Sequence, residues 1–255
     1  MCIENLTETA SKPILTIDKH LPSGTTIKIG LGGENGFVVI GGFAKARKTF
    51  LQDIIVSSAY TDQYSNGLQL HLKPDDEIIY FDADQTMAES FDTRNNLYEM
   101  CGGKPINYTP YNIKKYSHAV KRKLLPKFVY SHTNPKVIIY DNVNFFLNST
   151  NSELETIEFM DTITAISAET GCLSIPLSHM TMAADGHAHL RGVTGGYLNK
   201  VASTIFHCDH KRSEIEGYSK LSMEIRRGYF GKNLYFRQDE IDMMPVWAEY
   251  DENEF

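Results

Sequence analysis

One short segment of the chain combines glycine, lysine and threonine at a spacing that suits phosphate binding. Residues 42–49 read Gly-Phe-Ala-Lys-Ala-Arg-Lys-Thr, which matches the pattern G-x-x-x-x-G-K-[ST] except that Arg47 replaces the second glycine. In such a loop, backbone N–H groups and a positive helix end face the phosphates, the lysine reaches their β- and γ-oxygens, and the hydroxyl reaches Mg²⁺. The segment therefore predicts an ATP and Mg²⁺ site. The predicted nucleotide contacts are Gly42, Ala44, Lys45, Ala46, Arg47, Lys48, Thr49 and Phe50.

The residues around this segment bear on its interpretation. A buried strand is predicted at 36–41 and an apolar-faced helix at 49–60, which is the context that a phosphate loop needs. A strand–turn–helix corner with solvated lysines is the plainer alternative. Arg47 also has two interpretations, because it could add charge near the phosphates or its bulk could alter the loop and weaken hydrolysis.

A carboxylate for Mg²⁺ is predicted at the end of a second buried strand. Residues 136–141, Lys-Val-Ile-Ile-Tyr-Asp, are the most uniformly β-like run in the chain and end on Asp141. An aspartate in this position is also common as a helix cap or turn former. Downstream of a phosphate loop, the metal-site interpretation is favoured, so Thr49 and Asp141 are the predicted Mg²⁺ ligands.

Apolar runs alternate with longer amphipathic stretches, an order typical of a mostly parallel central sheet flanked by helices. The fold class is therefore predicted to be α/β. Gly171 is the expected C-cap of one helix, and Pro176 predicts an irregularity or a sheet edge in its strand. Strands are predicted at 36–41, 77–83, 136–141 and 172–179, and helices at 49–60, 87–100, 113–130 and 153–170.

The remaining segments complete a single expected domain over residues 1–255. A lead-in hairpin or extension is expected at residues 1–30, and an acidic tail is expected at residues 241–255. Residues 180–200 contain glycines and histidines and predict a loop-rich segment. Hairpins could join three further strands into an antiparallel C-terminal extension of the sheet. Those strands are predicted near 203–209, 219–225 and 233–238.

Composition narrows the class of protein. Acidic residues outnumber basic ones, 32 to 25, so a nucleic acid would have to bind to a local basic patch. The four cysteines lie far apart without C-x-x-C spacing, which favours reduced thiols over a disulfide framework or a zinc ribbon. The N-terminal residues do not resemble a secretory signal, and no segment approaches the roughly 20 apolar residues that cross a bilayer. We expect a cytoplasmic protein without a membrane partner.

Two other groups of residues are weaker candidates for a functional site, one for metal binding and one for nucleic-acid binding. The run His207-Cys208-Asp209-His210 contains metal-capable side chains, but alternation along a strand would send them to opposite faces. A lysine-rich helix near 113–130 either contacts a nucleic-acid backbone or is a solvated helix face, and the second is favoured. Its cations are Lys114, Lys115, Lys121, Arg122, Lys123 and Lys127.

Several segments together resemble one family. IGGFAKARKTF, IIYFDADQT, VIIYDN, LSIPLSHMT and EIRRGYFGKNLYF occur in the order found in RecA-like P-loop ATPases. The chain is most similar in this respect to hexameric replicative helicases of the DnaB and plasmid RepA kind, with a degenerate Walker A loop. The resemblance covers roughly residues 30–240 and implies a RecA-like fold.

The resemblance also implies roles for residues outside the loop. In this family a catalytic acid, usually glutamate, follows the strand after the P-loop helix, and Asp84 stands there, with Asp82 as the alternative. His179 matches a polar sensor of the γ-phosphate. Arg226, or else Arg227, matches an arginine finger that enters the next subunit's site, although many relatives have a lysine where Glu224 stands.

The implied partners are single-stranded DNA and other subunits. Residues 182–196 correspond to loops that track single-stranded DNA, and their candidate phosphate contacts are His187, His189 and Arg191. The leading hypothesis is an ATPase that couples hydrolysis to DNA in replication or mobilisation of a mobile element, as a hexameric ring or with a partner protein. The alternative is a nucleotide-binding regulatory or assembly subunit with weak or no hydrolysis. A P-loop kinase fits less well, because no lid segment or acceptor motif is evident.

Overall fold

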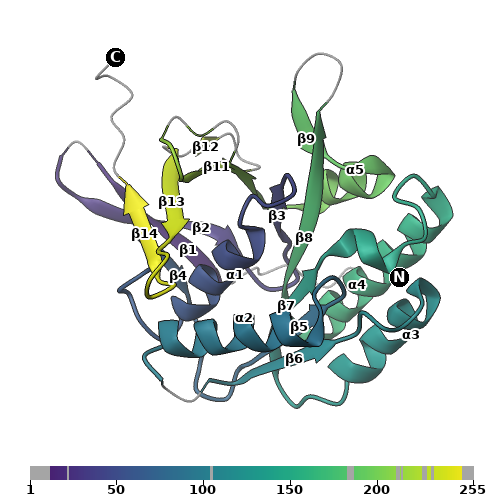
Figure 1. Ribbon diagram of the computed structural model, residues 1–255. Coiled ribbons are helices and arrows are strands. Elements are labelled where there is room, and N and C mark those ends of the chain that lie inside the picture. Colours follow the sequence, from purple (N-terminus) through teal and green to yellow (C-terminus); the bar gives the residue numbers. More distant parts are fainter. Residues whose placement is uncertain are drawn as a thin grey trace, which may run out of the picture.

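The computed structural model describes residues 12–248, apart from residues 22, 104–105, 183–186, 211–212, 214, 226–228 and 231–232. A large mixed sheet forms the centre of the fold (Figure 1), with the strand order β14-β13-β11-β10-β3-β8-β7-β5-β6. The strands from β10 to β6 in this order are parallel, and β11, β13 and β14 extend the sheet antiparallel. The prediction of a mostly parallel sheet with antiparallel C-terminal strands is confirmed.

The parallel strands are β3 (Val38–Gly42), β5 (Glu77–Asp82), β6 (Tyr108–Asn112), β7 (Pro135–Asp141), β8 (Leu173–Met182) and β10 (Thr204–Asp209). The antiparallel strands are β9 (Ala188–Leu190), β11 (Ser219–Ile225), β12 (Tyr229–Phe230), β13 (Leu234–Gln238) and β14 (Pro245–Ala248). A separate small sheet contains β1 (Leu15–His20), β2 (Thr26–Gly32) and β4 (Leu68–Leu70), in which β1 and β2 pair antiparallel. The helices are α1 (Lys48–Ser57), α2 (Met87–Met100), α3 (His118–Val129), α4 (Glu153–Thr170), α5 (Gly192–Val201) and the short 3-10 helix η1 (Val143–Phe146).

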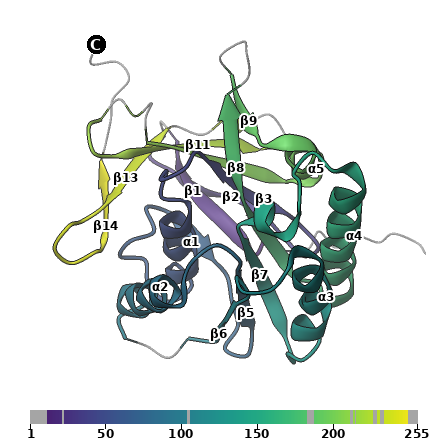
Figure 2. The same cartoon turned by 45° about the vertical axis from the view of Figure 1, so that its right-hand side comes forward.

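Helices cover both faces of the central sheet. Helices α1 and α2 and the small sheet pack on one face, and α3, α4 and α5 on the other (Figure 2). Strand β3 is buried along its whole length because it lies between these two layers. Both of its faces contact apolar side chains, which is why its sequence is continuously apolar or glycine rather than alternating.

Helix α4 shows how local sequence sets the ends of an element. Ser152 precedes the helix, and its hydroxyl accepts a hydrogen bond from the backbone N–H of Glu155. Gly171 follows the helix with a φ of 71°, the left-handed conformation expected of a C-cap glycine. The predicted range 153–170 and its C-cap are confirmed.

Two prolines lie inside strands rather than at their first residue, Pro176 in β8 and Pro110 in β6. Pro176 lies in β8 between β3 and β7, so the alternative of a sheet edge is wrong. The predicted irregularity is present, because an isolated bridge joins Phe37 to Ser174 and regular pairing with β3 resumes only at Leu177. Pro110 lies in β6, an edge strand of five partly polar residues that the sequence analysis missed.

The expectation of a loop-rich segment at 180–200 is wrong for its described residues. Strand β8 continues to Met182, β9 pairs back on it, and α5 follows. The glycines of α5 suggested a loop, but they allow close packing: a Cβ atom on Gly195 would lie 2.4 Å from the backbone of Leu190. Residues 183–186 lie outside the described residues.

The acidic tail expected from residue 241 is also partly wrong. Residues 245–248 form β14, which pairs with β13, and the indole of Trp247 donates a hydrogen bond to the carbonyl oxygen of Tyr64 at 2.8 Å. The ring of Trp247 also packs against Phe236. Residues 249–255 lie outside the described residues. Within the described part of the chain, no helix is both long and apolar enough to cross a membrane.

Candidate functional site

The predicted phosphate loop connects the end of β3 to the start of α1. Gly42 ends β3 beside β10, where a Cβ atom would lie 2.8 Å from the carbonyl oxygen of Cys208, so this approach requires glycine. Lys45 and Arg47 have left-handed backbones, with φ angles of 64° and 62°. The backbone at Arg47 therefore has the conformation that favours glycine, the residue that the pattern expects there.

The side chain of Arg47 extends toward the start of β11. Its Nη1 atom donates to the hydroxyl of Ser219 at 3.0 Å and lies 3.2 Å from Nδ1 of His210. Partial burial, and to a lesser extent the charge of Arg237, lower the pKa of Arg47. These contacts hold the arginine in place and offset part of the cost of its left-handed backbone.

Three other predicted contact residues differ in their surroundings. Ala44 is exposed on the loop and Ala46 is buried. Phe50 is buried, and its ring packs against Phe236 with the ring centroids 6.3 Å apart. The ring of Phe50 therefore belongs to the core, so its predicted contact with a nucleotide would involve the backbone alone.

The ammonium of Lys48 is buried at the base of the loop, with only 8% of the residue exposed. Its Nζ atom donates to the carbonyl oxygens of Phe43 at 3.1 Å and Gly42 at 3.3 Å, and lies 3.4 Å from Nδ1 of His179. Burial lowers the pKa of Lys48, whereas the carboxylate of Asp141 raises it. The loop thus surrounds a cation with its own carbonyl oxygens, where phosphate oxygens are better partners.

Thr49 and Asp141 meet although they come from α1 and β7. The Thr49 hydroxyl donates to Oδ2 of Asp141 at 2.8 Å, and the phenol of Tyr80 donates to the same oxygen at 2.9 Å. Burial raises the pKa of Asp141 to about 6, although these two hydrogen bonds oppose the shift. Asp53, one turn along α1, is buried too, and burial and the charge of Asp141 raise its pKa. A buried carboxylate of this kind gains from a cation.

The two acids after β5 have different surroundings. Asp82 is fully buried, and its Oδ1 atom accepts from the backbone N–H groups of Asp84 at 3.1 Å and Gln85 at 2.9 Å. It therefore shapes the loop. Asp84 is only half-buried; burial raises its pKa, and the charges of Lys114 and Lys48 lower it. Of the two candidates, Asp84 is the one placed to meet a water molecule.

Lys121 is a residue that the sequence analysis interpreted wrongly. It was grouped with the cations of a solvated helix face, but only 3% of it is exposed. Its Nζ atom donates to the carbonyl oxygens of Phe145 at 3.1 Å and Ala83 at 3.4 Å. One buried ammonium thus joins the loop that carries Asp84 to the segment that follows Asp141.

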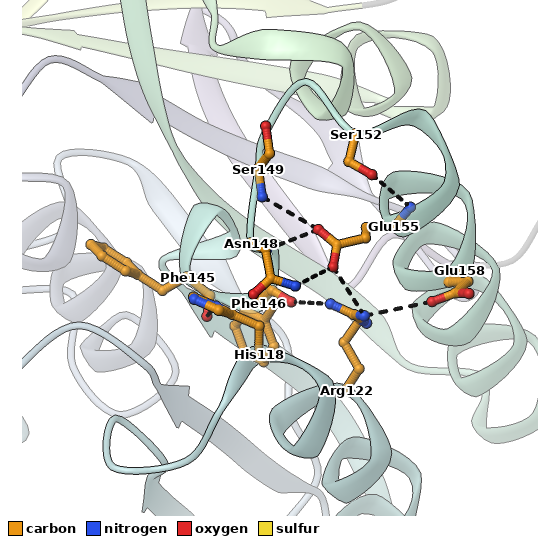
Figure 3. Close-up of polar contacts among 9 residues, drawn as sticks. All are labelled: His118, Arg122, Phe145, Phe146, Asn148, Ser149, Ser152, Glu155 and Glu158. Carbon is orange, nitrogen blue, oxygen red and sulfur yellow. Dashed lines mark hydrogen bonds and ion pairs between the residues drawn. The ribbon is translucent and has the colours of Figure 1, made fainter.

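Arg122, the next residue of α3, contacts the same segment (Figure 3). Its guanidinium donates to the carbonyl oxygen of Phe146 at 2.7 Å and lies 3.5 Å from Glu155 and 3.6 Å from Glu158. Glu155 in turn accepts from the backbone and side-chain nitrogens of Asn148. Lys121 and Arg122 are therefore bonded to groups within the fold, so their charged groups are not available on the surface to bind nucleic acid.

His179 lies in β8, between β3 and β7. Burial, and then the charges of Lys48 and Arg191, lower the pKa of His179 to about 4. The imidazole is consequently neutral at physiological pH. Its ring also meets the edge of Phe145, with the ring centroids 6.4 Å apart. His179 thus contacts both the phosphate-loop lysine and the segment after Asp141.

The remaining predicted residues lie farther along the chain. Strands β8 and β9 form a hairpin that projects beyond the sheet (Figure 1) and includes His189, whose Nε2 atom is 3.3 Å from the hydroxyl of Thr181. His187 and Arg191 flank β9 and are exposed. The candidate fingers Arg226 and Arg227 lie outside the described residues, so their role stays a prediction.

The run of metal-capable residues at 207–210 does not form a metal site. Cys208 is fully buried, whereas His207 faces the other side of β10 and lies 3.5 Å from Glu224. Across the described ranges, no group of three or more histidine, cysteine, aspartate or glutamate side chains could hold a metal ion.

The arrangement at the loop fits a nucleotide with Mg²⁺. Backbone N–H groups at the start of α1 and the Lys48 ammonium suit phosphate oxygens. The hydroxyl of Thr49 and the carboxylate of Asp141, already in contact, suit a hard cation that prefers oxygen ligands. A half-buried acid, Asp84, stands near the same lysine.

Comparisons with solved structures identify the fold. A structure of the RadB recombinase matches with a TM-score of 0.56 and 14% sequence identity, over 86% of this chain and 93% of that one. A KaiC-like protein from Pyrococcus horikoshii matches with a TM-score of 0.59 and 14% identity, over 93% and 100%. No protein-family model and no curated protein matches the sequence. The chain has a RecA-like α/β fold.

Substitutions at Arg47 test its left-handed backbone. We expect Arg47→Gly to be more stable than Arg47→Ala by about 1 kcal/mol, because both variants lose the contacts to Ser219 and only alanine keeps a Cβ atom. Urea unfolding measures the difference. In the matched pair Lys123→Gly and Lys123→Ala, inside α3, the order should reverse by about the same amount. An alanine variant at least as stable as the glycine variant at residue 47 would contradict the assignment.

The raised pKa of Asp141 predicts a pH dependence of stability. The carboxyl holds its proton up to a pH of about 6 when folded and about 4 when unfolded, so unfolding releases a proton between these values. The free energy of unfolding therefore falls as pH rises through this window. An amide side chain does not titrate, so the variant Asp141→Asn should gain roughly 2–3 kcal/mol relative to wild type between pH 4 and pH 7.

The comparison is made by urea unfolding at several pH values with chelator and without nucleotide. Measuring the difference between the two proteins cancels the titration of all the other groups that they share. Parallel stability curves for wild type and Asp141→Asn would show that Asp141 is not a buried, proton-retaining group.

Proposed function

We propose that this chain binds ATP with Mg²⁺, hydrolyses it, and couples hydrolysis to single-stranded DNA. The observation that carries this proposal is the convergence of Lys48, Thr49, Asp141 and Asp84 at the carboxyl ends of β3, β5 and β7. Ligands of open parallel sheets bind at this edge. The RecA-like fold agrees with the proposal, but a fold hosts many functions, so the site residues carry the argument.

Each of these residues has a proposed task. Lys48 and the N–H groups at the start of α1 hold the β- and γ-phosphates. Thr49 and Asp141 hold Mg²⁺, which would neutralise phosphate charge. Asp84 orients the attacking water and accepts its proton as the bond from the γ-phosphorus to ADP breaks. His179, neutral and beside Lys48, reports the state of the γ-phosphate to β8.

The DNA part of the proposal rests on the β8–β9 hairpin. The strand that carries His179 runs directly into this projecting hairpin, and Arg191 donates its backbone N–H to the carbonyl oxygen of His179 at 2.9 Å. A change at the nucleotide therefore has a short covalent and hydrogen-bonded path to exposed His187, His189 and Arg191. These side chains suit the phosphates of a single strand.

The biological process and the assembly remain part of the proposal. We place the protein in replication or mobilisation of a mobile element, as a hexameric ring in which Arg226 or Arg227 reaches a neighbouring site, or with a partner replication or mobilisation protein. The rival function is a nucleotide-binding assembly subunit without turnover. The short side chain of Asp84 favours this rival, because aspartate extends one methylene less than glutamate toward the attacking water.

The decisive experiment is steady-state ATP hydrolysis with Mg²⁺, in the presence and absence of single-stranded DNA. We expect turnover that DNA stimulates, and loss of ATP binding and turnover in Lys48→Ala, which lacks the ammonium in the loop. Lys123→Ala, which removes an exposed lysine from α3, should behave like wild type. Unchanged ATP affinity and turnover in Lys48→Ala would refute the phosphate-loop assignment.

A second pair of variants separates hydrolysis from binding. Asp84→Asn should lower the turnover rate by at least about tenfold and leave ATP affinity nearly unchanged, because it removes only the proton acceptor. Asp92→Asn changes an exposed aspartate in α2 and is the matched control. If wild type binds ATP without turnover, the assembly-subunit function replaces the ATPase. If Asp84→Asn turns over like wild type, another group is the acceptor.

A further inference from the structure

A cavity lies beside β6, at the edge of the sheet opposite β14. It has a volume of about 610 Å³ and lies where β5 and β6 end, between the start of α2 and the start of α3. Its lining includes Gln85, Met87, Tyr111, Lys114, Lys115 and Tyr116. The cavity begins one residue after Asp84, so an occupant would touch the loop that carries this acid.

The walls of the cavity combine aromatic surface with positive charge. The rings of Tyr111 and Phe128 stack with their centroids 4.3 Å apart. The ammonium of Lys115 lies over the ring of Tyr116 at 5.2 Å from its centroid. At the rim, Met87 is 72% exposed, and on the next turn of α2 Phe91 is 61% exposed. Because they lie four residues apart on one helix, Met87 and Phe91 present neighbouring apolar surface.

Two carboxylates near the cavity partly offset the positive charge of its lysines. Burial raises the pKa of Asp84 and the charge of Lys114 opposes this shift, whereas the hydrogen bonds from Thr86, and then the charge of Lys114, lower the pKa of Glu89. The Glu89 carboxylate also accepts from the backbone N–H and the hydroxyl of Thr86 within the helix cap. The exposed lysine pair therefore suits an anionic ligand that also offers an aromatic ring. A purely anionic ligand would gain nothing from the aromatic wall.

We propose that this cavity binds the acidic segment 249–255 of a second copy of the chain. That segment reads Glu-Tyr-Asp-Glu-Asn-Glu-Phe, so four carboxylates and two aromatic rings lie within seven residues. The carboxylates pair with Lys114 and Lys115, and a ring enters the cavity beside Tyr111 and Tyr116. The acidic, aromatic segment is thus complementary to the basic, aromatic lining of the cavity.

The arrangement of the sheet disfavours the segment of the same molecule. The segment begins directly after β14, and β14 and β6 are the two edge strands, eight strand-to-strand steps apart. At about 4.8 Å per step, they are separated by about 38 Å along the sheet. Seven extended residues reach at most about 24 Å. The segment of the same molecule is therefore too short to follow the sheet to the cavity, which favours another copy as the donor. Contacts of this head-to-tail kind close into a ring or continue as a filament.

The first test is binding of a fluorescently labelled peptide of residues 245–255 to the full chain, measured by anisotropy without nucleotide. We expect Lys114→Glu with Lys115→Glu to weaken binding by about tenfold or more, and added salt to weaken it in wild type. The matched control is Lys123→Glu with Lys127→Glu, which makes the same charge change on exposed positions of α3. Equal affinities in the two double variants would overturn the proposal.

A charge exchange makes the test specific. A peptide with Asp251→Lys, Glu252→Lys and Glu254→Lys should bind the Lys114→Glu, Lys115→Glu protein better than wild type. In sedimentation of the full chain, either set of reversals should abolish concentration-dependent association, and the two sets together should restore it. Both readouts are independent of ATP hydrolysis, so the proposed ATPase and this contact can fail separately.

Two results would assign the cavity to another occupant. If an oligothymidylate binds more tightly than the peptide and loses affinity only in the Lys114→Glu, Lys115→Glu protein, the cavity is a nucleic-acid site. If the peptide binds at the cavity but full-length association does not change with the charge reversals, the ligand is not a second copy. Either result overturns the proposal.

Discussion

Burial of an ammonium and a carboxyl at one end of the sheet is the constraint on which the site depends. Lys48 and Asp141 are both almost inaccessible to water, and neither can be left without partners there. Carbonyl oxygens of the loop satisfy the lysine, and hydroxyls of Thr49 and Tyr80 satisfy the aspartate. Every one of these partners comes from a different element or from the loop itself. The positions of β3, α1, β5 and β7 are therefore linked through this pair.

The segment after Asp141 extends the linkage to the rest of the molecule. Lys121 and Arg122 hold its carbonyl oxygens from α3, and Phe145 contacts His179. At its far end, the carbonyl oxygen of Thr150 accepts the backbone N–H of Val193 at 2.9 Å, at the start of α5. The segment after Asp141 is thus linked to α3 and α5 by hydrogen bonds and to the strand of the β8–β9 hairpin by the ring contact between Phe145 and His179. Under the proposed function, these contacts would connect the phosphate loop to the hairpin.

Features that depend on nearby residues could be predicted from the sequence, whereas features that depend on contacts between distant residues could not. Helix α4 could be bounded from sequence because its caps, Ser152 and Gly171, act within a few residues. Strand β6 could not, since its five residues are stabilised by pairing with β5 rather than by their own propensity. Helix α5 was missed because its glycines resemble those of a loop, whereas Gly195 packs against Leu190, a contact that composition does not reveal. Thr49 and Asp141 were both proposed as metal ligands, but only the fold places them in contact.

Lys121 and Asp82 show why site roles were harder to predict than the site itself. Both are charged residues in positions that sequence alone allows to be functional, and both are buried and occupied with backbone groups. Asp82 is held through Oδ1 alone, because its buried Oδ2 atom has no hydrogen-bond partner among the described residues, and Asp84 is the half-buried acid of the same loop. The Oδ1 atom of Asp82 accepts the backbone N–H of Asp84, so a shift of this backbone would break that bond. Under the proposed function, the reach of the short Asp84 carboxylate would decide whether the site hydrolyses a nucleotide or only binds it.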